Sequence, residues 1–132
     1  MNRLALGLLI VVGLCVAFPT FRERIPNGKN VPNPCQGSSG EWEGVGHNIK
    51  FGGGPRNPFG KDFAAAGSKW TTELCNKDSD SDGKTNGEEL GDPDCTWTKG
   101  GTPSGQATGH PGVCEPMDQD ACKSVNAAIN CL

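Results

Sequence analysis

The seven cysteines limit the folds open to this 132-residue chain more than any other feature. Cys15 lies in an apolar N-terminal segment, and six cysteines follow it at positions 35, 75, 95, 114, 122 and 131. Only 34% of the residues are hydrophobic, while Gly and Pro number 20 and 10. So little apolar side chain favours covalent cross-links over a large core. We therefore expect a small disulfide-rich α+β protein with short strands and long irregular Gly/Pro-rich loops.

Residues 1–17 are typical of a secretory signal peptide. Arg3 precedes an uncharged apolar run that ends in the small residues Cys15-Val16-Ala17. The run is shorter than the about 20 residues that a membrane-spanning helix needs. We expect a secreted, extracellular protein in which residues 18–132 form one domain, with 115–132 as a C-terminal tail tethered by its cysteines. The alternative is an N-terminal membrane anchor.

Removal of this segment leaves an even number of cysteines, which in an exported chain indicates disulfides. Zinc is the alternative, but no C-x-x-C pair occurs. The sequence does not choose among the pairings of Cys35, Cys75, Cys95, Cys114, Cys122 and Cys131. We favour a bond between Cys75 and Cys95, because these two flank an acidic loop that the bond would hold closed.

That loop, residues 78–89, matches the calcium-binding pattern D-x-D-x-D-G-x₅-E at every position. Calcium is a hard cation that takes about six to eight oxygen ligands. Gly83 allows the sharp turn, Lys84 offers only its backbone carbonyl, and Glu89 offers two oxygens. The predicted ligands of Ca²⁺ are Asp78, Asp80, Asp82, Lys84, Asn86 and Glu89. The alternative is a solvated acidic turn without metal.

The main helix is predicted over residues 62–75, leading into the loop. Its apolar residues form one stripe with Trp70 as the hub of the core: Phe63, Ala66, Gly67, Trp70 and Leu74. Gly91 and Pro93 should stop any exit helix within a turn, so we expect an unpaired, structural EF-hand-like site. We expect short strands near Trp42 and Val45, an irregular loop over 98–112 and a short helix over 121–129.

Other chemistry has little support in the sequence. The net charge of −3 argues against nucleic acid and membrane partners. No catalytic motif accompanies His47 or His110, so we predict that the protein is not an enzyme. These two histidines, with Met117, could form a second metal site or a contact site, although solvated or hydrogen-bonded histidines are the simpler interpretation. The Gly/Pro-rich region 47–59 is a candidate contact surface.

The chain contains several distinctive irregular stretches: RIPNG at 24–28, NVP at 30–32, GVGH at 44–47, NPFG at 57–60, DFAAAG at 62–67 followed by Trp70, and the acidic loop through CTW at 95–97. In this order they resemble the temptin family of secreted mollusc proteins. The resemblance covers most of residues 24–114. It implies an EF-hand-like calcium loop, disulfides, and a water-borne pheromone that attracts conspecifics together with other secreted pheromone proteins or through a chemosensory receptor.

Two other functions remain as alternatives at this point. One is a calcium-binding protein of extracellular matrix, mucus or egg mass, although the chain has neither repeats nor long acidic runs. The other is a copper or zinc redox protein built on His47 and His110.

Overall fold

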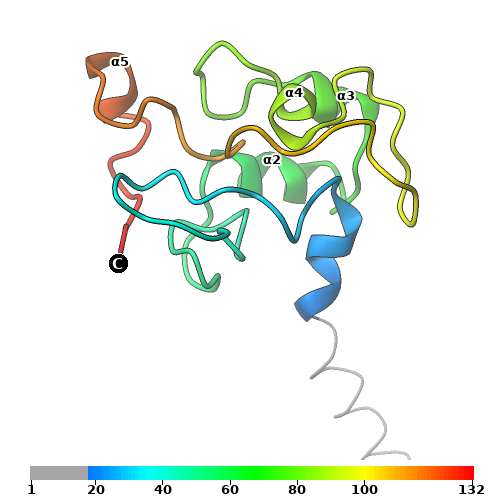
Figure 1. Cartoon of the computed structure of the whole chain (residues 1–132), viewed down its shortest axis with the longest axis horizontal. Helices are drawn as coiled ribbons and strands as arrows, with labels where there is room; N and C mark the ends of the chain where they lie inside the picture. The colour runs from blue at the N-terminus through cyan, green and yellow to red at the C-terminus, as the bar shows by residue number, and fades with distance from the viewer. Residues whose placement is uncertain (1–17) are drawn as a thin grey trace, which may run out of the picture.

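The computed structural model describes residues 18–132, and the predicted signal peptide, residues 1–17, lies outside the described residues (Figure 1). Short helices alternate with long loops in the described part: η1 (Phe18–Arg24), α2 (Pro58–Ala65), α3 (Thr72–Asn76), α4 (Asn86–Leu90) and α5 (Asp120–Lys123). None of these helices is long and apolar enough to cross a membrane. The expected small, loop-rich protein is confirmed.

The expected short strands do not form. Within residues 18–132, β structure is limited to isolated bridges, which join Pro32 to Glu41, His47 to Arg56, and Ile49 to Asn130. Glycine and proline interrupt the chain around each bridge, and both residues weaken strand interiors. The fold therefore depends on turns, side-chain hydrogen bonds and cross-links rather than on a sheet.

The predicted helix over 62–75 is wrong in both its limits and its continuity. The helix α2 begins at Pro58, where Asn57 caps it by accepting a 2.9 Å hydrogen bond from the Gly60 N–H. It ends at Ala65, because Gly67 and Ser68 adopt φ values of 77° and 58°. The chain then starts a separate helix, α3, whose N-cap is Thr71. The predicted helix rested on the spacing of apolar residues, which does not reveal that these two consecutive residues adopt the left-handed conformation that ends a helix.

The buried core gathers apolar residues from the whole described chain. Its members are Ile25, Val31, Val45, Phe59, Leu74 and Leu90, with Phe63, Ala66 and Trp70 packed at the edge. Trp42 is the fully buried tryptophan, whereas Trp70 is half-buried. The prediction of Trp70 as the hub was therefore wrong. Its indole N–H instead donates a 2.8 Å hydrogen bond to Asp92 Oδ2.

Disulfides join Cys35 to Cys131, Cys75 to Cys95 and Cys114 to Cys122. The first bond ties the C-terminus to the early part of the domain. The expected helix over 121–129 is shorter than predicted, because α5 ends at Lys123 and turns follow. In that turn region the Asn126 side chain bonds both the N–H and the C=O of Cys114, at 2.9 and 2.8 Å. The tail is thus held by side chains and cross-links.

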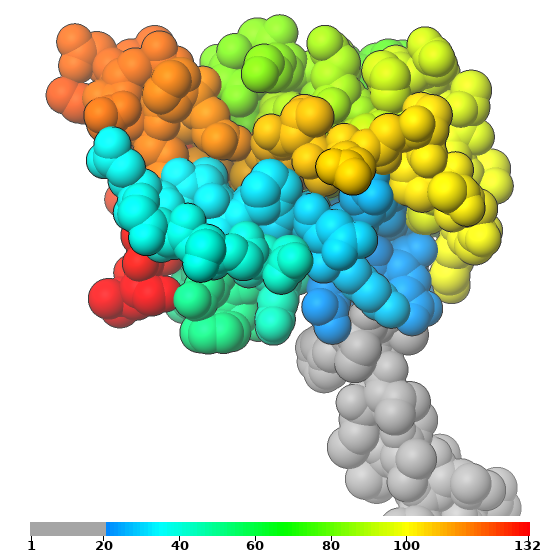
Figure 2. Space-filling model, in the orientation of Figure 1, coloured from blue at the N-terminus to red at the C-terminus, as the bar shows by residue number. Residues whose placement is uncertain are grey.

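The segment 98–112 is an irregular loop, as predicted, and lies across the face shown in Figure 2, between α4 and the N-terminal part of the domain. Backbone hydrogen bonds attach it to the end of α4, from Gly105 N–H to Gly91 O and from Thr108 N–H to Glu89 O. Asn27, from the N-terminal part of the domain, joins both α4 and this loop, because its side-chain amide donates to Leu90 O at 2.7 Å and to Gly105 O at 2.8 Å. The loop therefore connects the acidic region to the rest of the core.

Candidate metal centre

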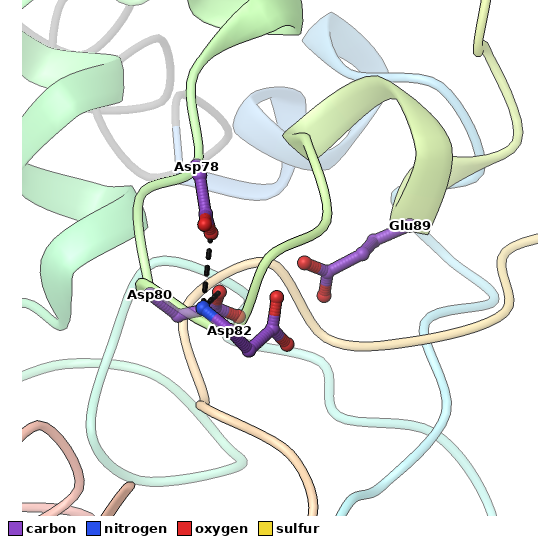
Figure 3. A group of neighbouring side chains, drawn as sticks. All are labelled: Asp78, Asp80, Asp82 and Glu89. Carbon is purple, nitrogen blue, oxygen red and sulfur yellow. Dashed lines mark hydrogen bonds between the residues drawn. The ribbon is translucent and has the colours of Figure 1, made fainter. Parts of the chain in front are cut away.

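The acidic loop brings four of the predicted ligands together. One carboxylate oxygen from each of Asp78, Asp80, Asp82 and Glu89 lies within 4.8 Å of the others. Figure 3 shows Asp78, Asp80 and Asp82 on the loop and Glu89 reaching toward them from α4. Asp80 and Glu89 are buried, Asp82 is half-buried and Asp78 is exposed. This group of oxygens has the composition that calcium prefers.

The acidic loop lies between the short helices α3 and α4. A capping box at the start of α4 gives Glu88 a different role from that of its neighbour Glu89. The hydroxyl of Thr85 accepts from the Glu88 N–H at 3.1 Å, and Glu88 Oε1 accepts from the Thr85 N–H at 3.0 Å. These bonds lower the pKa of Glu88. With Glu88 used at the start of α4, the next residue, Glu89, turns inward. Gly91 ends the helix at φ 81°, as the sequence predicts.

Hydrogen bonds within the loop hold the sharp turn at Gly83. The carboxylate of Asp78 accepts from the Gly83 N–H at 2.8 Å and from the Asp82 N–H at 3.2 Å. Asp82 in turn accepts from the Lys84 N–H at 3.0 Å. Gly83 adopts φ 90°, which only glycine adopts without strain. The exposed Lys84 side chain takes no part in these bonds, so its carbonyl is the group to consider as a ligand.

Buried oxygens without hydrogen-bond partners mark the acidic loop as a place where a cation would fit. Asp80 is 0% and Glu89 is 1% exposed. Asp80 Oδ2 and both Glu89 side-chain oxygens have no hydrogen-bond partner within the described residues. A buried anionic oxygen without a partner costs several kcal/mol of solvation free energy, so such atoms are normally paired with a donor or a metal.

Asn86 is fully buried and connects the loop to α3. Its amide nitrogen donates to Leu74 O at 2.8 Å and to Ser79 Oγ at 2.9 Å. Its Oδ1 is buried and has no hydrogen-bond partner in the described part of the chain. The amide thus braces the loop with one end and keeps an oxygen free at the other.

Without a cation, the buried acids repel one another. Burial, together with Asp82 and Asp78, raises the pKa of Asp80 to about 9. Burial and the charges of Asp80, Asp82 and Glu115 raise the pKa of Glu89 to about 10. These carboxyls would therefore hold protons at neutral pH, and a divalent cation would displace them.

Glu115 is a further acid near the site, outside the group of four, that the sequence analysis missed. A Cβ built on Gly109 would lie 3.2 Å from Glu89 Oε2 and 3.3 Å from Glu115 Oε1, so both carboxylates lie close to this glycine. Glu115 Oε1 accepts from the His110 N–H at 2.9 Å, and burial raises the pKa of the Glu115 carboxyl. No motif or spacing rule points to this residue, because it lies outside the loop pattern.

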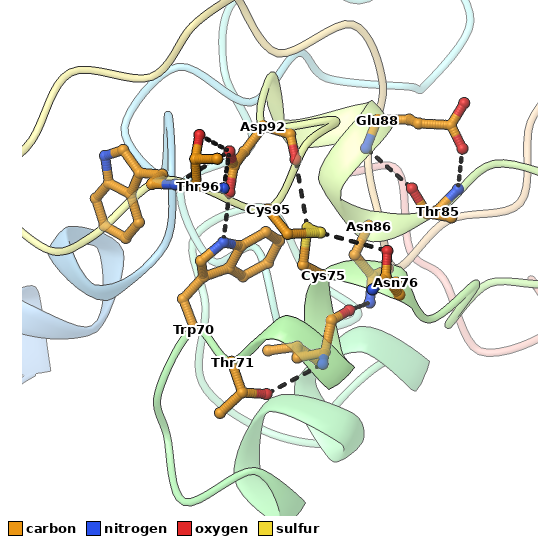
Figure 4. Close-up of a disulfide and its surroundings, with 12 residues drawn as sticks. Trp70, Thr71, Cys75, Asn76, Thr85, Asn86, Glu88, Asp92, Cys95 and Thr96 are labelled. Carbon is orange, nitrogen blue, oxygen red and sulfur yellow. Dashed lines mark hydrogen bonds between the residues drawn. A yellow bond between two sulfur atoms is a disulfide. The ribbon is translucent and has the colours of Figure 1, made fainter.

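The Cys75–Cys95 disulfide joins α3 to the segment that follows α4, with Cα atoms 5.8 Å apart (Figure 4). Asp92, which is buried beside it, accepts from the indole of Trp70 and from the N–H groups of Thr96 and Trp97. These bonds shape the chain that leads into Cys95. The cross-link and Asp92 therefore set the position of α4, and with it Glu89, relative to α3.

The two histidines lie outside this centre. His110 is fully buried against Trp42, with ring centroids 5.3 Å apart, and its Nδ1 accepts from the Gly112 N–H at 3.0 Å. Burial lowers the pKa of His110 to about 3, so the ring is neutral. His47 is half-buried, with Nδ1 3.2 Å from Gly54 O. The group of close ligand atoms found in residues 18–132 includes neither histidine.

Comparisons with known proteins agree on one family. A family model described as Temptin C-terminal matches residues 15–113, a stretch that contains the whole acidic loop. Temptin of Aplysia californica is 50% identical over 114 residues, which cover 86% of this chain and 90% of that relative. No solved structure matches the chain.

Proposed function

This chain belongs to the temptin family, and from that membership we propose that it is a secreted, water-borne protein pheromone braced by calcium and disulfides. It attracts conspecifics together with other secreted pheromone proteins or through a chemosensory receptor, and it catalyses no reaction. The 50% identity to Temptin over most of both chains is the observation that carries the signalling part of the proposal.

The calcium part rests on the unpartnered oxygens of the buried acids. We assign as ligands the carboxylates of Asp78, Asp80, Asp82 and Glu89, the carbonyl of Lys84 and the side-chain oxygen of Asn86. An all-oxygen set with several carboxylates suits a hard divalent cation and gives no reason to expect copper or zinc. Calcium would replace the missing partners of Asp80 Oδ2 and of both Glu89 oxygens.

Calcium in this position would act as a structural brace. The helices α3 and α4 have five residues each, far below the about 12 residues at which an isolated helix becomes marginally stable. A cation shared between the loop and Glu89 would hold α4 against the loop. The carbonyl of Glu89 also accepts from the N–H groups of Thr108 and Gly109, so the same cation would help to anchor the 98–112 loop.

A water-choice assay tests the signalling proposal. Purified folded protein is released at one arm of a two-arm chamber, alone and mixed with other proteins that the animal secretes into the water. Protein that has been reduced and alkylated is the matched control. We expect attraction to the folded protein, strongest in the mixture, and none to the control. Equal choice of both arms in every mixture would contradict the proposal.

Measuring where the secreted protein accumulates distinguishes a pheromone from a structural matrix protein. A pheromone should appear in the water around the animals. Retention of nearly all the protein in washed egg mass or mucus, with release only by a calcium chelator, would instead indicate a matrix protein.

A further inference from the structure

A cavity of about 410 Å³ lies between η1, the loop 43–56 and α2, away from the acidic centre. Its volume is within the range of about 300–1,000 Å³ that small-molecule sites occupy. In Figure 1, η1 and the loop 43–56 both lie below α2. We propose that this cavity, called here the aromatic pocket, binds a small amphipathic carboxylate with one ring-sized apolar body.

Aromatic side chains form the apolar wall. Of the chain's five phenylalanines, four line the pocket: Phe21, Phe51, Phe59 and Phe63. The ring of Phe63 stacks on Phe59 at 6.1 Å and meets the ring of Phe21 edge-on at 6.4 Å. Phe21 is 43% and Phe51 is 71% exposed. Large aromatic rings left open to water at the edge of a cavity favour an apolar ligand that would cover them.

Positive charge surrounds the same pocket, although the whole chain carries a net charge of −3. Arg22 and Arg56 line the cavity, and neither belongs to an ion pair within the described residues. Two further cations lie over its exposed rings, Arg24 at 5.0 Å from the Phe21 centroid and Lys50 at 4.9 Å from that of Phe51. Glu43 is the acid in the lining. Cations thus outnumber acids, which favours an anion.

The floor of the pocket is preformed. Gly46 and Gly60 pack backbone to backbone, since a Cβ on Gly46 would lie 2.9 Å from Gly60 Cα. Asn57, the cap of α2, donates to Val45 O at 2.7 Å and to His47 O at 3.0 Å. The helix and the loop therefore hold a defined spacing, and little ordering is required when a ligand enters.

A small carboxylate fits these features better than a protein partner does. Its ring would lie among the phenylalanines, and its carboxylate would meet a guanidinium, whose planar fork binds two carboxylate oxygens at once. The site does not share any lining residue with the acidic loop. The inference is therefore independent of the calcium proposal and goes beyond the proposed function.

Calorimetric titration of the calcium-saturated protein with three probes tests the proposal. The probes are 3-phenylpropionate, its uncharged amide 3-phenylpropanamide, and propionate, which lacks the ring. We expect 3-phenylpropionate to bind at least about tenfold more tightly than either of the others. Equal binding of acid and amide, or the absence of binding by all three, would overturn the proposal.

Two variants and one control locate the binding. Arg56→Gln and Phe51→Ala alter exposed side chains, so both should fold, and each should weaken 3-phenylpropionate binding at least about fivefold. Lys99→Gln removes an exposed cation outside the pocket and should leave binding unchanged. Calcium titration of the same variants should be unaltered. Unchanged probe binding in both pocket variants would overturn the assignment while leaving the calcium proposal intact.

Sedimentation of the unliganded protein tests the competing occupant. A concentration-dependent dimer that Phe51→Ala abolishes and 3-phenylpropionate does not dissociate would mean that a second copy of the chain covers the pocket. That result would also overturn the proposal.

Discussion

Glu89 Oε2 and Glu115 Oε1 both border Gly109, lying 3.2 and 3.3 Å from the position that a Cβ on this glycine would occupy. Glu89 comes from the short helix α4, whereas Glu115 follows the irregular 98–112 loop. The loop backbone bonds to Glu89 O on its way, through Thr108 and Gly109. A cation at the acidic centre would therefore be linked to the C-terminal part of the domain as well as to its own loop.

Glu89→Gln should abolish calcium binding. The substitution keeps the size of the side chain but removes the charge of the residue that joins α4 to the loop. We expect the dissociation constant to rise at least about a hundredfold, or about 3 kcal/mol, measured by calorimetric titration. The matched control is Lys84→Ala, which keeps the backbone carbonyl and should change the affinity little. Equal affinities of Glu89→Gln and the natural protein would contradict the assignment.

Glu115→Gln should weaken calcium binding about three- to tenfold without abolishing it. The carboxylate lies near Glu89 and contributes negative charge to a site whose acids Asp80 and Glu89 are buried, where charges are poorly screened. Asp118→Asn, which removes an exposed carboxylate three positions further on, is the control and should have no effect. If both variants bind calcium as the natural protein does, Glu115 has no part in the centre.

Gly109→Ala should also weaken calcium binding, although it removes no ligand. The added methyl group would press on both Glu89 and Glu115, at distances tighter than ordinary van der Waals contact. Gly105→Ala in the same loop is a matched control, because its nearest neighbour would be Gly91 O at 3.8 Å. Titration of the two variants should show a loss of affinity at position 109 alone. A similar loss in both would indicate a general disturbance of the loop.

The calcium-free protein should lose stability as the pH rises from about 4 to about 10. Burial and neighbouring acids raise the pKa of Asp80 from 3.8 to about 9 and that of Glu89 from 4.5 to about 10. The folded state then binds more protons than the unfolded state in this window, so raising the pH favours unfolding. Melting temperatures measured in chelator should fall with pH, and saturating calcium should flatten the slope. If the melting temperature in chelator did not change with pH, Asp80 and Glu89 would not have raised pKa values in the folded protein.

Removing the Cys75–Cys95 bond should lower both stability and calcium affinity. The bond closes a loop with a sequence separation of 20, which in the chain-entropy picture contributes about 3 kcal/mol to stability. The double variant Cys35→Ala/Cys131→Ala, which opens a loop with a separation of 96, is the comparison. Removal of either disulfide should lower the urea midpoint of unfolding. Only removal of Cys75–Cys95 should weaken calcium binding, because this bond joins α3 to the segment after α4. Equal calcium affinities in the two would contradict that coupling.

Features that depend on neighbouring residues were accessible from the sequence. The pattern over 78–89 predicted which four acids converge, and the structure brings them within 4.8 Å. The end of α4 at Gly91 also followed from local backbone preferences. The predicted helix over 62–75 was wrong for an equally local reason. Its spacing of apolar residues favoured one continuous helix, but Gly67 and Ser68 adopt positive φ values that end the helix.

Features that depend on contacts between distant segments were not accessible. Glu115 comes near the acidic centre after the 98–112 loop has packed on α4, and Trp42 rather than Trp70 is fully buried, with His110 against it. The aromatic pocket likewise requires η1, the loop 43–56 and α2 to meet. Alternating acids and a glycine turn specify the acidic loop through short-range geometry, so the local sequence was sufficient to predict it. Side chains far apart in sequence meet through packing and cross-links, whose partners composition and spacing do not encode.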